Sequence, residues 1–417
     1  RCDADGKNIY LISGGNEPEY TPSLMPNGQI LYTRWEYTDK ELMRIQSLWT
    51  VNPDGTGTNA FWGNQSYWPD MLVEARVIPG SGRAIFSGQG HHNVYWGSLG
   101  VVDPKKGRNY PDGLTKVTQD VKWCEVGDGP AERPETTKYH TAGAYRGYKS
   151  PYPLSSELFL TSARASGRSS KFKLFLMDIY GNRELIYESA FHALYGLPIR
   201  ARKAPPVIPD RVEWAGAQKD RRKIKPGVFF CADVYQGAPK ILKDKAKYLR
   251  VIQLDWNTAT LGKKLQDVDH PRAQPHLHVG PVVSLAVNDG VKHVLGTVPV
   301  AKDGSVYFEA PPCRSLHFQL LDEKHRTLQT MRSFTNVMPG ELRGCVGCHE
   351  DQDLAPTGRP GRPMKGSPAK LTPYPWGAGY SFGYERDIQP ILDKNCGKCH
   401  QDKGKGRKKL DMTLRAS

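Results

Sequence analysis

The sequence predicts a mainly β protein: a partial β-propeller, then a β-sandwich-like domain, then a small α-helical C-terminal segment. Turn formers are frequent among the 417 residues, with 42 Gly and 32 Pro, and aromatic strand formers include 20 Tyr and 9 Trp. Short apolar runs that end in turns recur through the first half, and alternating apolar and polar residues return after residue 226. This combination suits turn-rich sheets better than a helical bundle.

An internal repeat organises residues 1–198, which we interpret as the propeller part. Strand pairs that recur with turns of Asp, Pro and Gly are typical of propeller blades with insertions. An ordinary antiparallel sandwich is the alternative. An apolar strand followed by such a turn lies at 47–55, 98–104 and 173–181, another strand precedes each at 26–32, 81–86 and 156–160, and residues 3–12 resemble the end of a fourth copy.

Roughly three blades can be counted, and propeller rings usually close with four to eight. We therefore expect further blades to be encoded before Arg1 or to be supplied by another chain. No signal peptide is recognisable, and the opening residues resemble the middle of a domain.

Residues 199–225 are rich in Arg, Lys and Pro, which predicts an interdomain linker. Residues 226–354 then form a predicted β-rich middle domain, in which alternation and turns such as Asp303-Gly304 favour a compact sandwich. Its expected strands lie at 228–231, 248–252, 282–287, 305–308 and 316–321.

The final part divides into a tether and a helical segment. Residues 355–376 are rich in Pro, Gly and Lys and predict an irregular tether. In residues 377–417, Pro390 suits the first turn of a short helix. The residues Ile388, Ile391 and Leu392 share one face of this helix.

The chain is strongly basic, with a formal charge of +15. Nucleic-acid binding is not indicated, because no recognition helix or stacking platform accompanies the charge. No apolar run approaches the roughly 20 residues that a membrane span needs. The basic clusters are either solvated loops or a docking face for an acidic redox partner. They lie at 200–203, 219–225, 240–250 and 403–409.

Two CxxCH motifs carry the chemistry, and both match the pattern of covalent c-type haem attachment. In this pattern two thiols bind the vinyl groups on one porphyrin edge, and the adjacent histidine turns under the ring toward the iron. The motif residues are Cys345, Cys348 and His349, and Cys396, Cys399 and His400. We expect two covalent haem c groups and a cytochrome c-like C-terminal segment.

A zinc site built from two CxxC pairs is the alternative. A zinc ribbon usually places its second pair about 15–20 residues after the first. Here 47 residues separate Cys348 from Cys396, and both pairs carry an adjacent histidine that zinc does not require. A thioredoxin-like function is also disfavoured, since neither motif has a βαβ context.

The sixth ligand of each iron decides between electron transfer and catalysis. Met412 is a candidate sixth ligand of the second haem, but it follows His400 so closely that the loop between them is short for reaching the other face of the haem. Clustered histidines are further candidates, although each can equally be a surface or structural residue. These are His91, His92, His276 and His278.

With these residues in view, the chain resembles the hydrazine synthase alpha subunit family of anammox bacteria and related planctomycete proteins. The resemblance is carried by 295–300, 303–305, 329–334, 339–341 and 388–392, and by Gly344-Cys345-Val346-Gly347-Cys348-His349-Glu350. It covers nearly the whole chain and is best from about residue 290 onward.

The resemblance implies a six-bladed propeller, a middle domain with an unusual haem and a C-terminal domain with a bis-histidine haem. In the family, a tyrosine one turn after the first motif histidine binds the iron, and that histidine binds zinc. Here the position four residues after His349 is Asp353, and the nearest downstream tyrosines are Tyr374, Tyr380 and Tyr384. This difference favours His349 as an ordinary iron ligand.

The resemblance also leaves a zinc ion near the first haem open. Cys231 and Cys124 are the candidate thiols for it, and buried free thiols are the alternative for both. His349 is accordingly predicted to bind either the haem iron or zinc, whereas His400 is predicted to bind haem iron.

Three functions remain open at this stage. The first is a dihaem redox subunit of an extracytoplasmic complex, in the periplasm or the anammoxosome lumen, with other redox subunits or small cytochromes as partners. The second is the full enzyme, which would make hydrazine from hydroxylamine or nitric oxide and ammonia. The third is a propeller scaffold whose haems are incidental. No catalytic residue is assigned; Glu350, Asp351 and Asp353 are proton-transfer candidates by proximity, or a solvated acidic turn.

Overall fold

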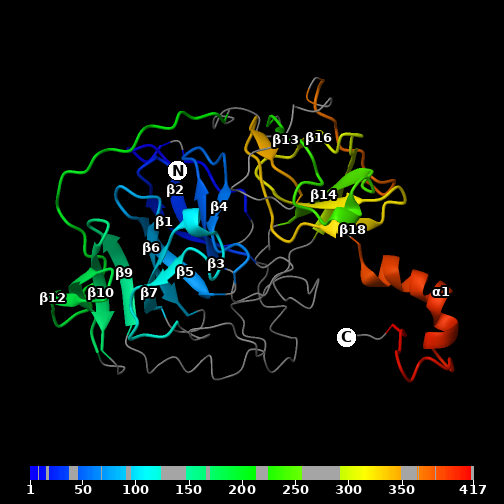
Figure 1. Ribbon diagram of the computed structural model, residues 1–417. Helices are drawn as coiled ribbons and strands as arrows, with labels where there is room; N and C mark the ends of the chain where they lie inside the picture. Colours follow the sequence, from blue (N-terminus) through cyan, green and yellow to red (C-terminus); the bar gives the residue numbers. More distant parts are fainter. Residues whose placement is uncertain are drawn as a thin grey trace.

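The computed structural model shows a mainly β protein, and the α-helix in its described residues lies near the C-terminal end (Figure 1). Three antiparallel meanders form the N-terminal part, two further sheets form the middle domain, and α1 (Gln389–His400) lies at the far side of the middle domain. The structure describes residues 1–7, 9–15, 18–36, 46–66, 68–90, 95–123, 147–165, 170–212, 224–255, 292–348, 364, 366–380 and 382–414.

Each N-terminal meander has four antiparallel strands, and single residue pairs, Gln46 with Met71 and Gly97 with Tyr148, link neighbouring meanders. The first meander is β1 (Glu19–Leu24), β2 (Ile30–Trp35), β3 (Gln46–Val51) and β4 (Asn59–Trp62). The second is β5 (Met71–Val77), β6 (Ala84–Gln89), β7 (Gly97–Val102) and β8 (Leu114–Lys116), with the short helix η1 (Pro104–Lys106) before β8. The third is β9 (Gly147–Pro153), β10 (Leu158–Arg164), β11 (Lys173–Asp178) and β12 (Arg183–Tyr187).

The meanders repeat in conformation as well as in sequence. Thr21, Glu74 and Ser150 occupy matching places in the first strand of each meander and have φ of 50°, 54° and 53°. The pairing register shifts beside each of these residues. A bulge of this kind increases the local strand twist. The shared bulge shows that the three meanders are copies of one structural unit.

The predicted strands of the repeat correspond to β2, β3, β6, β7, β10 and β11. The expectation of a strand at residues 3–12 is wrong for the described part, because residues 9–12 lie in no strand. This segment is mostly exposed, with Ile9 at 79% and Leu11 at 51%, so apolar burial contributes little to ordering it as a strand.

Two sheets make up the middle domain. One has the order β16 (Val306–Ala310), β13 (Gly227–Cys231) and β19 (Leu342–Cys345). The other has the order β15 (Lys292–Pro299), β14 (Tyr248–Leu254), β17 (Ser315–Leu321) and β18 (Thr327–Thr330). Side chains from both sheets share one apolar core, in which the Phe229 ring stacks on Phe308 and meets Phe318 edge to face. The predicted strand at 282–287 lies outside the described residues.

A buried polar seam joins the first meander to the middle domain. The Arg34 side chain is completely buried, its Nη2 donates to the Phe334 carbonyl (2.7 Å) and lies 2.8 Å from Glu36 Oε1. The guanidinium group also lies 3.3 Å from the centre of the Phe334 ring and 4.0 Å from that of Trp49. The Ser333 hydroxyl donates to both Glu36 oxygens (2.6 and 2.8 Å). The meander and the domain therefore hold a fixed relation.

Two segments without regular structure connect these parts. Residues 188–212, which include much of the predicted linker, run back across the first meander, where Arg211 N donates to Asp54 Oδ2 (2.8 Å). The short helix η4 (Lys240–Leu242) follows β13. Near the C-terminal end, the predicted tether pairs with both middle-domain sheets, through Ala369 with Phe308 and Thr372 with Thr297.

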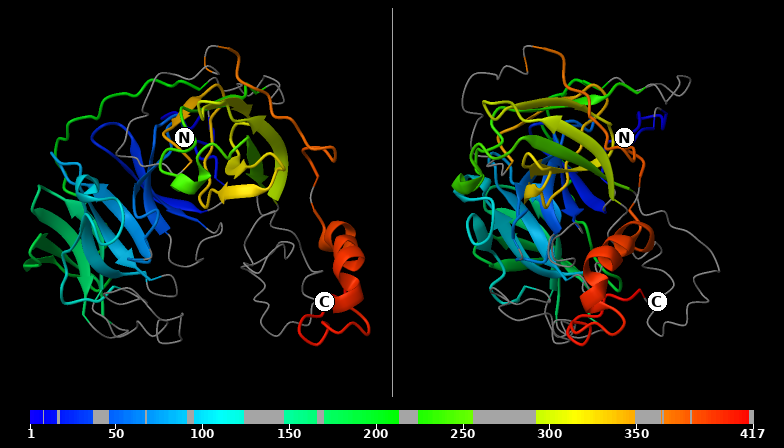
Figure 2. Two further views of the ribbon diagram at one scale, coloured as in Figure 1. Left: turned by 45° about the vertical axis from the view of Figure 1, so that its right-hand side comes forward. Right: turned by 90° about the vertical axis from the view of Figure 1, so that its right-hand side faces the viewer.

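Residues of the tether lead into α1 (Figure 2). A series of aromatic side chains lies along this path. The Tyr374 and Trp376 rings stack at 4.6 Å, and Trp376 meets Phe382 edge to face. The Tyr374 hydroxyl lies within hydrogen-bond distance of Arg250 Nε (3.1 Å), Arg250 Nη2 (2.9 Å) and His325 Nδ1 (3.1 Å). The tether is thereby attached to the outer face of the four-stranded sheet before it reaches the helix.

The helix begins as the sequence predicts, with Pro390 in its first turn. A π-helical turn, η7 (Tyr384–Ile388), precedes it. Hydrogen bonds from Arg386, Tyr380 and the Gly383 backbone hold the pKa of Asp387 down at about 2, and its carboxylate therefore stays ionised at this helix start. Among the described residues, no helix has both the length and the apolarity to cross a membrane.

Candidate cofactor site

A cavity of about 540 Å³ lies in the middle domain, at the side that faces the first meander. This volume falls in the range of roughly 300–1,000 Å³ that cofactor and ligand pockets occupy. Aromatic and aliphatic side chains make up much of its wall. They include Phe229, Phe308, Phe318, Leu249 and Leu320, which come from both sheets.

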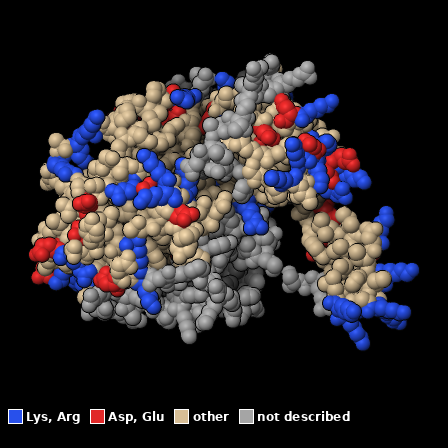
Figure 3. Space-filling view, viewed as in Figure 1, with Lys and Arg blue, Asp and Glu red and all other residues tan. Residues whose placement is uncertain are grey.

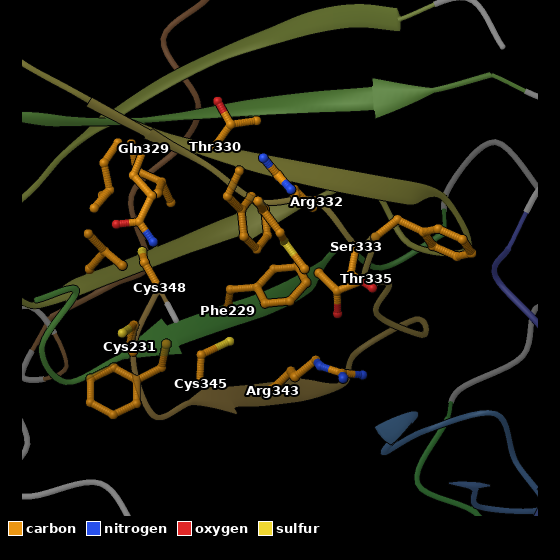
Figure 4. A pocket seen from close by; sticks show the side chains of 18 of the residues that line it. Phe229, Cys231, Gln329, Thr330, Arg332, Ser333, Thr335, Arg343, Cys345 and Cys348 are labelled. Atoms are coloured by element: carbon orange, nitrogen blue, oxygen red, sulfur yellow. The ribbon is translucent and has the colours of Figure 1, made fainter. Parts of the chain in front are cut away.

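The thiols of the first motif line this cavity. Cys345 ends β19, which pairs in parallel with β13 so that Cys345 lies beside Cys231. Cys348 also lines the cavity, and its backbone N–H donates to the Val234 carbonyl (3.4 Å). Figure 4 shows Cys231, Cys345 and Cys348 gathered at one end.

Glycine is required inside the motif by a close backbone contact. A Cβ atom at Gly347 would lie 2.2 Å from the Gln236 carbonyl oxygen. Because two atoms cannot approach so closely, any larger residue would push the loop from the 233–236 turn. The turn therefore sets the two thiols of the motif against the cavity.

Burial keeps the thiols of Cys348 and Cys231 protonated. It raises the pKa of Cys348 to about 12, with Cys345 and Asp233 adding to the effect. Burial also raises the pKa of Cys231 well above its usual range, and the two motif cysteines raise it further. Among the described residues, no disulfide joins the cysteines, which are Cys2, Cys231, Cys313, Cys345, Cys348, Cys396 and Cys399.

Cys231 was expected as a zinc ligand, but the part of the chain that the structure describes contains no complete zinc site around it. There, no group of three or more His, Cys, Asp or Glu side chains is arranged to hold a metal ion. Several of the expected ligands and acidic residues lie outside the described residues: His349, Cys124, Glu350, Asp351, Asp353, His91, His92, His276 and His278.

The cavity also reaches the first meander, and polar side chains contribute to its wall there. The side chains of Trp49, Asn59, Asn64 and Gln65 contribute to its wall from the meander. From the middle domain, Ser333, Thr335 and Arg343 line the same end, and Figure 4 shows these three apart from the thiols. No pattern in the sequence indicated the meander residues, because only the fold brings together positions nearly 300 residues apart.

None of the tyrosines considered as iron ligands lines this cavity. Tyr374 contacts Arg250 and His325 on the outside of the four-stranded sheet. Tyr380 forms a hydrogen bond to Asp387, and Tyr384 is 54% exposed in the turn before α1. Met331 does line the cavity, and its thioether was not anticipated from the sequence.

The second motif lies at the C-terminal end of α1, where Cys396 is half-buried and Cys399 is exposed. His400 Nδ1 lies 3.0 Å from the Leu410 carbonyl oxygen. A carbonyl only accepts, so Nδ1 carries the proton and Nε2 remains available for a metal. The backbone N–H of Met412 donates to the His400 carbonyl (3.0 Å), so residues 401–412 fold back against the helix end.

Two glycines allow this return of the chain. A Cβ atom at Gly404 would lie 2.3 Å from the Cys399 carbonyl oxygen, and one at Gly406 would lie 2.8 Å from His400 Cε1. The Gly406 N–H also donates to the Cys399 carbonyl (2.8 Å). Residues 404–406 therefore form a close-fitting support for the imidazole ring.

Known proteins resemble this chain in its middle domain and in its fold. Residues 244–350 match the family model described as the hydrazine synthase alpha subunit middle domain. Among solved structures, Kuenenia stuttgartiensis hydrazine synthase resembles this chain with a TM-score of 0.69 and 15% sequence identity, over 96% of this chain and 57% of that chain. At this identity the likeness concerns the fold. No curated protein matches the chain significantly.

Proposed function

We propose that this chain, a hydrazine synthase alpha-like protein by its middle domain, is a dihaem c-type cytochrome. It would serve as a subunit of an extracytoplasmic redox complex in nitrogen metabolism. The first haem would be attached at Cys345 and Cys348, and the second at Cys396 and Cys399.

One observation carries this proposal: the two thiols of the first motif line a large cavity with apolar walls, in the region that matches the family. A porphyrin needs apolar walls for its faces and two thiols near one edge for its vinyl groups. The cavity provides both, with Phe229, Phe308 and Phe318 among its lining residues. A haem c held there would supply an iron that accepts and donates single electrons.

Residues of the chain itself would shield the haems from water and bind their iron. The aromatic wall excludes water, which strengthens electrostatic interactions within the cavity. At the second motif, the Leu410 carbonyl fixes the proton of His400 on Nδ1 and leaves Nε2 for the iron. His349 is the proposed iron or zinc ligand of the first motif, and Cys231 is the thiol proposed for zinc.

The N-terminal meanders support a propeller architecture. Three four-stranded antiparallel units with one shared bulge are what three blades of a ring require. We propose that residues 1–198 form such blades and that residues 377–417 belong to a cytochrome c-like segment. The first blade would then close one end of the cofactor cavity.

Two versions of this function make different use of the first haem. In a hydrazine synthase-like enzyme, hydroxylamine or nitric oxide would react with ammonia at an open iron position. The alternative is a purely electron-transfer dihaem cytochrome in which the propeller serves for docking. Asp353 stands where the family has its ligating tyrosine, and none of Tyr374, Tyr380 and Tyr384 lines the cavity, which favours this alternative.

The surface around the second motif suits acidic redox partners. Figure 3 shows Lys and Arg side chains projecting from the C-terminal element. Complementary charge accelerates encounter between redox proteins and orients them. The proposed partners are other redox subunits or small cytochromes, in the periplasm or the anammoxosome lumen. The exposed lysines are Lys394, Lys398, Lys403, Lys405, Lys408 and Lys409.

Optical spectra of the reduced protein, with and without carbon monoxide or nitric oxide, test the two versions. The chain with both motifs should be compared with the pairwise variants Cys345→Ser/Cys348→Ser and Cys396→Ser/Cys399→Ser, which assign each spectrum to one haem. The Cys396→Ser/Cys399→Ser variant retains only the first haem, and the enzyme version requires that this haem binds the added gas. If both haems ignore it, the electron-transfer version stands; if neither motif binds haem, the proposed function fails.

A further inference from the structure

The cofactor cavity has two chemically different ends. The thiols of Cys231, Cys345 and Cys348 lie at one end, beside the Gln329 side chain, and the polar side chains of Ser333, Thr335 and Arg343 lie away from them (Figure 4). A haem has the same asymmetry, with vinyl groups on one edge and two propionate carboxylates on another. A guest held by its vinyl edge at Cys345 and Cys348 would extend its carboxylates away from the thiols.

Arg343 is a cation at the polar end, and its hydrogen-bond acceptors are backbone carbonyls. Its Nη1 donates to the Asn336 carbonyl (3.3 Å) and its Nη2 to that of Thr58. No carboxylate is among its partners in the described residues. The nearby acids are already engaged: Glu36 with Arg34 and Ser333, and Glu341 with the N–H groups of Gly57 (2.9 Å) and Met338 (2.8 Å).

Thr335 adds a second donor at this end. Its side chain is 7% exposed and lines the cavity, and its Oγ1 has no hydrogen-bond partner among the described residues. A buried hydroxyl without a partner is costly unless something else satisfies it. In Figure 4, Thr335 and Arg343 lie on the same side of the cavity. Together they provide the donors that a carboxylate would need.

The strand geometry connects the two ends. Arg343 and Cys345 are two residues apart on β19, so their side chains leave the same face of the sheet. Their Cα atoms are separated by about 7 Å along the strand, and the length of the arginine side chain adds to this span. One strand therefore carries both an attachment thiol and a carboxylate receptor.

We propose that Arg343 and Thr335 bind a propionate carboxylate of the haem attached at Cys345 and Cys348. This inference rests on the proposed function and adds the orientation of the cofactor. The carboxylate edge then lies at the seam with the first meander, because Arg343 also contacts the Thr58 carbonyl. The meander thus contributes to holding the cofactor.

The test uses the full chain with Cys396→Ser and Cys399→Ser, so that only the first haem is observed. Thr335→Val is the most specific change, because it removes a hydroxyl that has no hydrogen-bond partner among the described residues and keeps the shape of the side chain. Arg343→Gln removes the charge, and Arg343→Lys restores it without the forked geometry. Matched controls in the same domain are Thr327→Val and Arg326→Gln, both at exposed positions.

Two measurements report on the carboxylate: the propionate vibration in resonance Raman spectra and the pH dependence of the reduction potential. The reduction potential should change over the pH range in which the propionate takes up a proton. In Arg343→Gln this range should lie about one pH unit or more higher than in the parent, because the carboxylate loses its neighbouring cation. Thr335→Val should shift the vibration, Arg343→Lys should restore the pH profile in part, and the controls should match the parent.

A haem that stays attached with an unchanged vibration and pH profile in Thr335→Val and Arg343→Gln would overturn the inference. If Arg343→Gln does not fold or bind haem, the propionate vibration and the pH profile of Thr335→Val and Arg343→Lys test the inference instead. Absence of haem from the parent chain would instead overturn the proposed function, and the haem content measured for each variant separates these outcomes.

Discussion

His400 Nδ1 and the Leu410 carbonyl oxygen lie 3.0 Å apart, which fixes the imidazole tautomer at the second motif. The loop that supplies this carbonyl passes so close to the ring that only glycine fits at 406. A backbone carbonyl from the return loop, and not a side chain, therefore orients the proposed iron ligand.

Gly406→Ala should disturb this ligand. The new Cβ would lie 2.8 Å from His400 Cε1, so the loop or the ring must move and the 3.0 Å hydrogen bond should lengthen. The electron paramagnetic resonance spectrum of the second haem should then change in its g values. Gly379→Ala is the matched control, because its Cβ would meet no atom within 4 Å. Identical spectra for Gly406→Ala and the parent would count against the support described for His400.

Breaking the buried pair at the seam should destabilise the chain strongly. Glu36→Leu leaves the Arg34 guanidinium buried without its carboxylate, which typically costs about 3–5 kcal/mol in the free energy of unfolding. Denaturant unfolding followed by tryptophan fluorescence measures this, and Arg34→Met/Glu36→Leu should recover part of the loss. Glu188→Leu, in an exposed pair with Lys173, should have little effect. A small loss in Glu36→Leu would show that the seam contributes little.

Tyr374→Phe should loosen the tether. The change removes the hydroxyl that contacts Arg250 and His325 but leaves the stacking on Trp376. Hydrogen bonds to charged groups contribute about 1.5–3 kcal/mol. Limited proteolysis should therefore cut residues 366–382 faster in Tyr374→Phe than in the parent. The control is Tyr180→Phe, whose side chain is 77% exposed. Equal cleavage rates would mean that the Tyr374 hydroxyl does not hold the tether, and that its backbone pairing and aromatic contacts suffice.

The thiols of the haem-free chain should differ in reactivity with pH. The thiolate is the form that reacts with iodoacetamide, and burial raises the pKa of Cys348 to about 12. Below that pH most of this thiol stays protonated, so its alkylation should be slow at pH 8 and accelerate as the pH rises toward 12. Mass spectrometry of the peptides, with the exposed Cys2 as internal reference, follows both rates. Alkylation of Cys348 as fast as Cys2 at pH 8 would contradict its burial.

Sequence patterns predicted the buried strands of the fold well and the exposed ones poorly. β3 and β7 are buried along their whole length, and their apolar runs are plain in the sequence. β12 is exposed throughout, and β9 carries Pro151 and Pro153, which usually argue against a strand. Proline is tolerated in β9 because only one residue pair links it to β7.

The candidate site was predictable only in its covalent part. Covalent haem attachment uses two cysteines that lie close together in the chain. The spacing of Cys345 and Cys348 therefore indicates it directly in the sequence. The cavity wall from the first meander depends on packing between distant segments, and so does the burial of the Thr335 hydroxyl. No local pattern records such contacts.

Mass spectrometry of the native protein tests the central claim most directly. Peptides that contain Cys345 with Cys348, and Cys396 with Cys399, should each carry the added mass of one haem, and the pyridine haemochrome spectrum should give two haems for each chain. Peptides with unmodified cysteines, together with zinc in the intact protein, would contradict the account.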